Sequence, residues 1–236
     1  MTDRPRIICL MSSSLDGGLH PGRWTHSPDG TIEQWSGAYE ALHDELAADA
    51  WLVGRTTMAE MAKGVPHSPA TVATTPPRPM HLVDRKGPFA IAIDRSGKLH
   101  FAASDVGGDP VLVLLGRDVA DAHLAELVAD DISYIIAGDE EMALPPLMTT
   151  LRRELGIETL LLEGGGVVNG SFLAAGLVDE LYVLLAPALD ASSSGSIVET
   201  GGAGLRGKLT LSLLACDQLD GGAVRLHYGV ASDPTP

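Results

Sequence analysis

Three consecutive glycines in the second half of the chain have the character of a phosphate-binding turn. They lie between the apolar run of residues 159–162 and an expected helix over residues 167–175. Glycines at such a junction leave backbone N–H groups uncovered at the positive end of the helix dipole, where an anion is stabilised. The sequence therefore predicts a nucleotide cofactor here, although a tight strand-to-helix turn would by itself also require glycine. The residues of this turn are Glu163, Gly164, Gly165, Gly166, Val167 and Val168.

A second expected strand, residues 50–53, ends in a similar polar group. Gly54, Arg55, Thr56 and Thr57 follow it directly. Amides and threonine hydroxyls at a helix start can donate to a diphosphate, and an arginine can bind a terminal phosphate through two parallel hydrogen bonds. The alternative is a threonine N-cap with an arginine that faces solvent. The formal net charge of −15 makes an arginine at such a place more informative than in a basic protein.

Two further strand ends carry polar side chains that can contact a ligand. They are Ser14 and Asp16 after the first strand, and Asp94, Arg95 and Ser96 after the third. A plain turn explains the second group equally well, and an Asx-turn explains Asp16, whose carboxylate could otherwise orient a substrate or transfer a proton. Parallel strands bring their carboxyl ends to one edge of a sheet, so we interpret these strand ends together as one ligand site.

Composition excludes several classes of protein. The acidic balance argues against a nucleic acid or an anionic membrane surface as partner. No apolar run reaches the length of a membrane span or a signal segment, so we expect a cytoplasmic protein. The two cysteines, Cys9 and Cys216, lie in apolar runs and are predicted to be buried thiols. The eight histidines show no metal-ligand spacing, and the motifs of zinc deaminases, P-loop proteins and serine hydrolases are absent.

The elements that position these residues follow an alternating pattern. Near-continuous Val, Ile and Leu runs separated by helices predict an α/β fold with a mostly parallel sheet and helices on both faces. Strands are expected over residues 6–11, 50–53, 89–93, 111–115, 132–137, 159–162 and 180–186, and helices over residues 39–46, 56–62, 119–129, 145–155 and 167–175. Residues 208–216 and 223–230 flank a glycine turn and predict a C-terminal antiparallel hairpin. Residues 65–79 read as a proline-rich loop that could act as a lid, and residues 1–236 as one domain.

Taken together, these motifs resemble the reductase family built on the dihydrofolate reductase fold, in particular the RibD C-terminal family of riboflavin-pathway pyrimidine reductases. Four segments carry the resemblance. They are Ser14-Leu15-Asp16-Gly17, Gly54-Arg55-Thr56-Thr57, Glu163-Gly164-Gly165, and residues 177–183 leading to Pro187. Their order and spacing cover residues 6–229, nearly the whole chain.

The resemblance implies an NADPH-dependent oxidoreductase that delivers a hydride to C1′ of a ribosylamino-pyrimidine. By the same resemblance Arg55 lies near the cofactor 2′-phosphate and Thr57 near the pyrophosphate, with Gly54 and Thr56 beside them. Asp94, Arg95 and Ser96 would border the adenosine end. The diphosphate would lie on Gly164, Gly165, Gly166, Val167 and Val168. The residues expected to face the substrate are Ser14, Asp16 and Glu163, of which the two carboxylates are the candidate catalytic groups.

One position departs from the family pattern. Riboflavin-pathway members usually carry a lysine after the Ser-x-Asp-Gly segment, and this chain has Gly18 there. The identity of the small-molecule substrate is therefore open. A pterin or another C=N compound is one alternative, and a protein that binds NADPH without catalysis is another. The family resemblance also implies a homodimer, for which the C-terminal hairpin offers an edge or a face.

Overall fold

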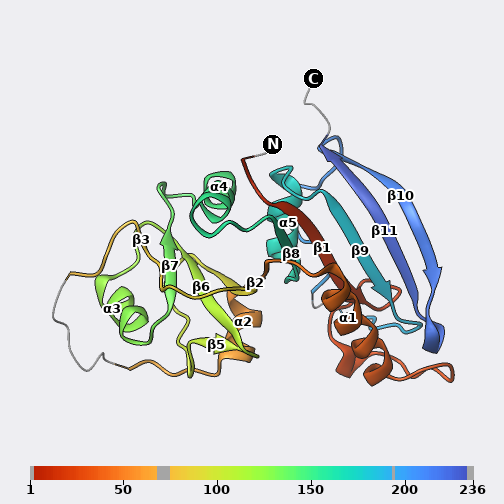
Figure 1. Cartoon of the computed structure of the whole chain (residues 1–236). Coiled ribbons are helices and arrows are strands. Elements are labelled where there is room, and N and C mark those ends of the chain that lie inside the picture. The colour runs from red at the N-terminus through yellow and green to blue at the C-terminus, as the bar shows by residue number, and fades with distance from the viewer. Residues whose placement is uncertain (1–2, 68–74, 193–194, 233–236) are drawn as a thin grey trace. The chain divides into compact units, whose positions relative to one another are not determined.

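A computed structural model describes residues 3–67, 75–192 and 195–232 of the chain (Figure 1). The residues divide into two compact units by their contacts. Unit 1 consists of Asp49–Glu158 together with the N-terminal residues up to Pro5, and unit 2 consists of Arg6–Ala48 and Thr159–Pro236. The chain thus enters unit 2, passes through unit 1 and returns to unit 2. The sequence predicts a single domain, and this division by contacts does not test that prediction.

Unit 1 is built on a mostly parallel sheet in the order β2-β4-β6-β7-β3. The parallel strands are β2 (Ala50–Gly54), β4 (Phe89–Asp94), β6 (Asp109–Leu115) and β7 (Ser133–Ile136). Two short strands, β3 (Met80–His81) and β5 (Asp105–Val106), pair antiparallel with β7 and β6. The helices are α2 (Arg55–Ala62), α3 (Asp121–Ala129) and α4 (Leu144–Leu155). The parallel strands are almost wholly apolar and buried, as strands covered on both faces require.

Unit 2 has the strand order β10-β11-β9-β1-β8. β1 (Arg6–Ser13) lies between β8 (Thr159–Leu162) and β9 (Glu180–Leu185) and is parallel to both. β10 (Leu209–Gln218) and β11 (Val224–Ser232) form an antiparallel hairpin that joins β9 through β11 (Figure 1). The helices are α1 (Ile32–Leu46) and α5 (Gly166–Ala174), and short 3-10 turns are η1 (Pro21–Arg23) and η2 (Asp220–Gly222).

The strands and helices expected from the sequence are present, with bounds that shift by a few residues. The largest difference is α1, which starts at Ile32, seven residues before the expected position. Its start is fixed by a capping box in which the Thr31 side chain accepts from the backbone of Gln34 and the Gln34 side chain accepts from the backbone of Thr31. The predicted C-terminal hairpin is confirmed, with η2 as its turn.

One expectation about the cysteines is wrong. Cys9 is fully buried in β1, as expected, whereas Cys216 is exposed. Cys216 lies on the outer strand of the hairpin, where no strand of the described chain pairs with the free edge of β10. Within the proline-rich loop, residues 68–74 lie outside the described residues, and with them the predicted lid. No helix in the described part of the chain is long and apolar enough to cross a membrane.

Candidate active site

In unit 2, Glu163 joins two residues of α1 that the sequence reasoning missed. The Tyr39 hydroxyl donates to Oε1 of Glu163 at 2.8 Å, and Nδ1 of His43 lies 2.9 Å from the same oxygen. Tyr39 and His43 are four residues apart, so one face of the helix presents both. The only sequence signal was this spacing of a tyrosine and a histidine on an amphipathic helix, and nothing in it pointed to Glu163.

Burial and the nearby Glu163 charge shape the acid–base properties of this cluster. Burial first, and the adjacent carboxylate second, raise the pKa of Tyr39 well above its usual value, so the phenol stays neutral and donates. The same two causes raise the pKa of Cys9 to about 12. Cys9 is therefore an unreactive thiol at neutral pH, which leaves Glu163 and His43 as the groups of this cluster that can exchange a proton.

Ser14 and Asp16 form a tight turn after β1. The Ser14 hydroxyl donates to the Asp16 carboxylate at 2.5 Å and accepts from the backbone N–H of Gly18 at 2.9 Å. The Asp16 carboxylate also accepts from the backbone N–H groups of Asp190 and Ala191, at 3.0 and 2.7 Å. The turn is thereby fastened to the segment that follows β9.

These hydrogen bonds determine what Asp16 can do chemically. They lower the pKa of its carboxyl from 3.8 to about 2, with the Ser14 hydroxyl as the largest cause. An exposed carboxylate with such a pKa stays ionised at neutral pH and can accept hydrogen bonds, but it holds no proton to transfer. Asp16 lines a cavity of about 320 Å³ together with Gly18, Ser192, Gly195, Ser196 and Glu199.

Gly18 is required by its neighbour Asp190. A Cβ atom added at position 18 would lie 2.4 Å from the Asp190 Cβ and 2.6 Å from its Oδ2, which is far inside contact distance. Both carboxylate oxygens of Asp190 are buried and have no hydrogen-bond partner among the described residues. The position at which the resemblance predicts a lysine is therefore closed here by an acidic side chain that has no hydrogen-bond donor among the described residues.

The glycine turn of unit 2 opens α5 without a side-chain cap. Gly164 and Gly165 have φ angles of +126° and +41°, and a Cβ added to either would meet nothing within 4 Å. The N-cap residue, Gly165, makes no side-chain cap hydrogen bond, and the first turn, which begins with Gly166, Val167 and Val168, carries no acidic residue. One side of the helix start is covered by the segment Ser196–Glu199, whereas the side chain of Val167 is 63% exposed.

The start of α2 in unit 1, like that of α5, has no side-chain cap. Gly54 is its N-cap residue and contributes no side-chain hydrogen bond, and the first turn has no acidic residue. Arg55 is the first helical residue, and its side chain is exposed, as is that of Thr56 one residue on. A cation in the first turn is disfavoured by the helix dipole unless an anion lies nearby. Thr57 completes this first turn.

Asp94, Arg95 and Ser96 follow β4, the strand next to β2. Asp94 is fully buried, and its carboxylate accepts from the backbone N–H groups of Lys98 and Leu99. Arg95 donates to the backbone carbonyl of Glu140. Asp94 therefore orders the turn, and the exposed backbone and side chains around it are what a ligand could reach.

The structure groups the predicted site residues into sets within each unit. In unit 1 the register aligns Gly54 with Ile93, so Arg55 and Asp94 lie at the same end of neighbouring strands. In unit 2 the register aligns Leu162 with Cys9, whereas β1 continues to Ser13. Glu163 is therefore level with Leu10, several residues before the Ser14–Asp16 turn, and the two carboxylates have different partners.

Two solved structures illustrate the fold that this chain shares. A pyrimidine reductase-like protein of Corynebacterium diphtheriae is 19% identical, with a TM-score of 0.68 over 96% of this chain and 92% of that one. RibD of Acinetobacter baumannii is 23% identical with a TM-score of 0.65, and the match covers 98% of this chain but only 59% of RibD. These structures confirm the predicted α/β fold of the dihydrofolate reductase type.

Sequence comparison identifies the family to which the chain belongs. The sequence model of the RibD C-terminal domain matches residues 5–223, and the chain belongs to this family. The 2,5-diamino-6-ribosylamino-4(3H)-pyrimidinone 5′-phosphate reductase of Methanothermobacter thermautotrophicus is 28% identical over 189 residues, 78% of each chain. The predicted family is thus confirmed, and a function like that of riboflavin-pathway pyrimidine reductases is supported.

Proposed function

We propose that this protein is an NADPH-dependent reductase that transfers a hydride to C1′ of a ribosylamino-pyrimidine or a related substrate. The start of α2 carries the proposal. An uncapped helix N-terminus whose first residue is an exposed arginine fits a bound phosphate. The uncapped start of α5 supplies a second place of the same kind.

The residues present fit a reduced dinucleotide. Arg55 would bind the 2′-phosphate, with Gly54, Thr56 and Thr57 donating to phosphate oxygens. The amides of Gly164, Gly165, Gly166, Val167 and Val168 would hold the diphosphate, and the turn of Asp94, Arg95 and Ser96 would border the adenosine end. When bound, NADPH supplies the hydride, which forms the new C–H bond at C1′ while the bond from C1′ to the ring oxygen breaks and that oxygen takes a proton.

The substrate side of the proposal rests on Ser14, Asp16 and Glu163. Asp16 stays ionised and orders the turn in which Ser14 lies, so its part is to accept hydrogen bonds. Glu163 is the better candidate for handling the proton, because it contacts His43 and the neutral phenol of Tyr39. The carboxylates of Asp16 and Glu199 around the cavity favour a substrate rich in N–H donors, such as an aminopyrimidine.

Cofactor binding tests the proposal through Arg55. We expect Arg55→Ala to weaken NADPH binding by about 10- to 100-fold and to leave NADH binding nearly unchanged, since a charge-assisted hydrogen bond to phosphate contributes about 1.5–3 kcal/mol. Titration of each dinucleotide by calorimetry measures both affinities. Arg153→Ala removes an exposed arginine from α4 and serves as the control. Equal binding of NADH and NADPH by the unchanged protein would contradict the role of Arg55.

Gly18 and Asp190 favour one alternative substrate class, pterins or other C=N compounds. Position 18 carries glycine in place of the lysine that the resemblance predicts, so the cation expected to contact a riboflavin-pathway substrate is missing, and the buried carboxylate of Asp190 lies against Gly18. Assays of dihydrofolate and of the ribosylamino-pyrimidine side by side separate these reductions. If bound NADPH is oxidised in a single turnover by neither compound nor by other C=N acceptors, the protein binds the cofactor without catalysis.

We further propose a homodimer in the cytoplasm. The outer strand of the hairpin leaves Leu211, Leu213 and Leu214 about half exposed, at 47%, 57% and 57%. An exposed apolar strand at a sheet edge is a favoured place for pairing with another chain. A second copy of the chain is the partner that the family resemblance favours.

A further inference from the structure

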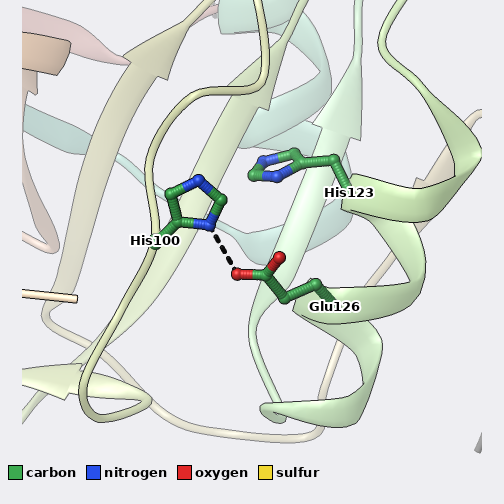
Figure 2. Close-up of side chains that lie close together, drawn as sticks. All are labelled: His100, His123 and Glu126. Atoms are coloured by element: carbon green, nitrogen blue, oxygen red, sulfur yellow. Dashed lines mark hydrogen bonds and ion pairs between the residues drawn. The ribbon is translucent and has the colours of Figure 1, made fainter. Parts of the chain in front are cut away.

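A cluster of histidines and carboxylates in unit 1 lies outside every residue assigned to the reductase. His100, in the segment that follows β4, and His123 and Glu126, both on α3, lie together (Figure 2). Nδ1 of His100 is 2.6 Å from Oε1 of Glu126. One ligand atom from each of the three side chains lies within 4.8 Å of the others.

His123 is the member of the cluster that ordinary packing does not explain. The residue is 7% exposed, and its Nε2 is buried without a hydrogen-bond partner among the described residues. Its ring meets that of His100 edge-on, with centroids 5.6 Å apart. A buried imidazole nitrogen without a hydrogen bond is costly, and a bound cation is one of the few partners that would offset this cost.

The elements that hold the three side chains are fixed independently of any ligand. His123 and Glu126 are three residues apart on α3, so they project from one face of the helix. The backbone of His100 lies against Gly64, where an added Cβ would come within 2.2 Å of it. His123 itself lies against Gly97 of the β4 turn. The three potential ligands are therefore presented by preordered backbone.

We propose that His100, His123 and Glu126 form a binding site for a first-row transition-metal dication of the zinc class. Two imidazoles and one carboxylate are a donor set that suits Zn²⁺, whereas Mg²⁺ and Ca²⁺ prefer oxygen ligands alone. Three protein ligands leave a fourth position of the tetrahedron for water or a further side chain. The ion would tie α3 to the segment after β4, next to the turn of Asp94.

Besides the three proposed ligands, other titratable side chains lie close to Glu126. Glu126 is 7% exposed in its side chain and is also reached by His67, whose Nδ1 lies 3.5 Å from Oε1. His67 pairs with Asp130 at 3.0 Å as well, so a further histidine and carboxylate border the cluster.

Little in the sequence indicates this site. A helix with His-x-x-Glu has two potential ligands at the right spacing, but the third ligand comes from a loop more than twenty residues earlier. The expectation that the histidines bind no metal considered only their spacing along the chain. In the folded chain, His100 lies close to His123 and Glu126 although it is distant from them in sequence.

The test uses the purified full chain without an affinity tag, stripped of metal by a chelator. We expect Zn²⁺ to bind at one equivalent per chain, to raise the melting temperature, and to compete with Co²⁺, whose bound form gives visible absorption bands of a low-symmetry site. Glu126→Gln, His100→Gln and His123→Gln should each weaken Zn²⁺ binding by roughly tenfold or more, because each removes a direct ligand. His26→Gln, an exposed loop histidine, is the matched control.

Two results would overturn the proposal. One is a melting temperature that excess Zn²⁺ leaves unchanged in the stripped protein. The other is Zn²⁺ affinity that is the same in all three ligand variants as in His26→Gln, which would indicate binding by surface histidines only. Glu126→Gln keeps the shape of the side chain, so it decides the question if far-ultraviolet circular dichroism shows that a histidine variant fails to fold. None of these measurements depends on reductase activity.

Discussion

Asp16 and Glu163 are both carboxylates that follow a parallel strand, yet their surroundings give them different chemistry. Asp16 is exposed and accepts hydrogen bonds from a hydroxyl and two backbone amides, which hold its pKa near 2. Glu163 is mostly buried and contacts a phenol and an imidazole. The first arrangement stabilises an anion and orders a turn, whereas the second places a carboxylate beside a phenol, which donates a hydrogen bond to it, and an imidazole, which can exchange a proton with it.

The hydrogen bonds of Asp16 predict how stability depends on pH. The folded pKa, about 2, is below the ordinary aspartate value of 3.8, so the ionised carboxylate stabilises the fold above pH 3.8. This contribution is lost as the pH falls from 3.8 to about 2. We expect the free energy of unfolding of the native protein to approach that of Asp16→Asn over this range, measured by urea unfolding. A difference between the two that stays constant with pH would contradict the prediction.

Glu163 is expected to be needed for turnover more than for cofactor binding. We expect Glu163→Gln to lower kcat by about 100-fold, the usual scale of a lost proton-transfer group, with NADPH affinity little changed. Tyr39→Phe keeps the carboxylate and loses one hydrogen bond to it, so the rate should fall less. Steady-state kinetics and NADPH titration on the same preparations measure both effects. Loss of NADPH binding without loss of kcat would place Glu163 with the cofactor instead.

At the scale of elements, the helix starts differ in a way that separates scaffold from site. α1 begins with a complete capping box, so the N–H groups of Thr31 and Gln34 are satisfied by side chains of the chain itself. α2 and α5 begin at glycines without side-chain caps and without acidic residues in their first turns. The starts of α3 and α4 also lack side-chain caps, but α3 carries Asp121 in its first turn and α4 has prolines in its first turn, which have no N–H group. The starts of α2 and α5 have neither feature, which favours an anion there.

Two helical glycines test how closely α5 is packed. An added Cβ at Gly170 would lie 1.9 Å from the carbonyl oxygen of Glu199, whereas one at Gly37 of α1 would meet nothing within 4 Å. We expect Gly170→Ala to lower the free energy of unfolding by about 1–3 kcal/mol, the cost of overpacking. Gly37→Ala should raise it by about 0.4–1 kcal/mol through the unfolded chain. Denaturant melts of both variants compare them directly, and equal effects of the two would refute the close approach.

At the scale of the whole molecule, the exposed leucines of β10 are the surface through which we expect two copies of the chain to associate. We expect Leu213→Glu to convert a dimer into a monomer, because paired copies would bring like charges together at an apolar face. Sedimentation velocity measures the change. Val65→Glu alters an even more exposed apolar side chain in unit 1 and should leave the assembly intact. A native protein that sediments as a monomer at all concentrations would contradict the dimer.

Sequence patterns predicted most of the elements for an identifiable reason. Buried parallel strands need continuous runs such as residues 159–162, and glycines and prolines mark where helices end. The early start of α1 was missed because Ile32 to Ala38 are mixed in polarity, and only the reciprocal bonds of Thr31 and Gln34 reveal the cap. The exposure of Cys216 was missed because an apolar run does not reveal whether a strand lies at an edge.

The sequence alone determined the family, the strand ends that carry polar residues, and the glycines that open α5, because each depends on residues close together in the chain. Tertiary structure alone decided the contacts between distant segments. It brought Tyr39 and His43 to Glu163, closed position 18 with Asp190, and gathered His100, His123 and Glu126. Such contacts follow from strand register and helix packing, which depend on the whole chain and leave no local pattern.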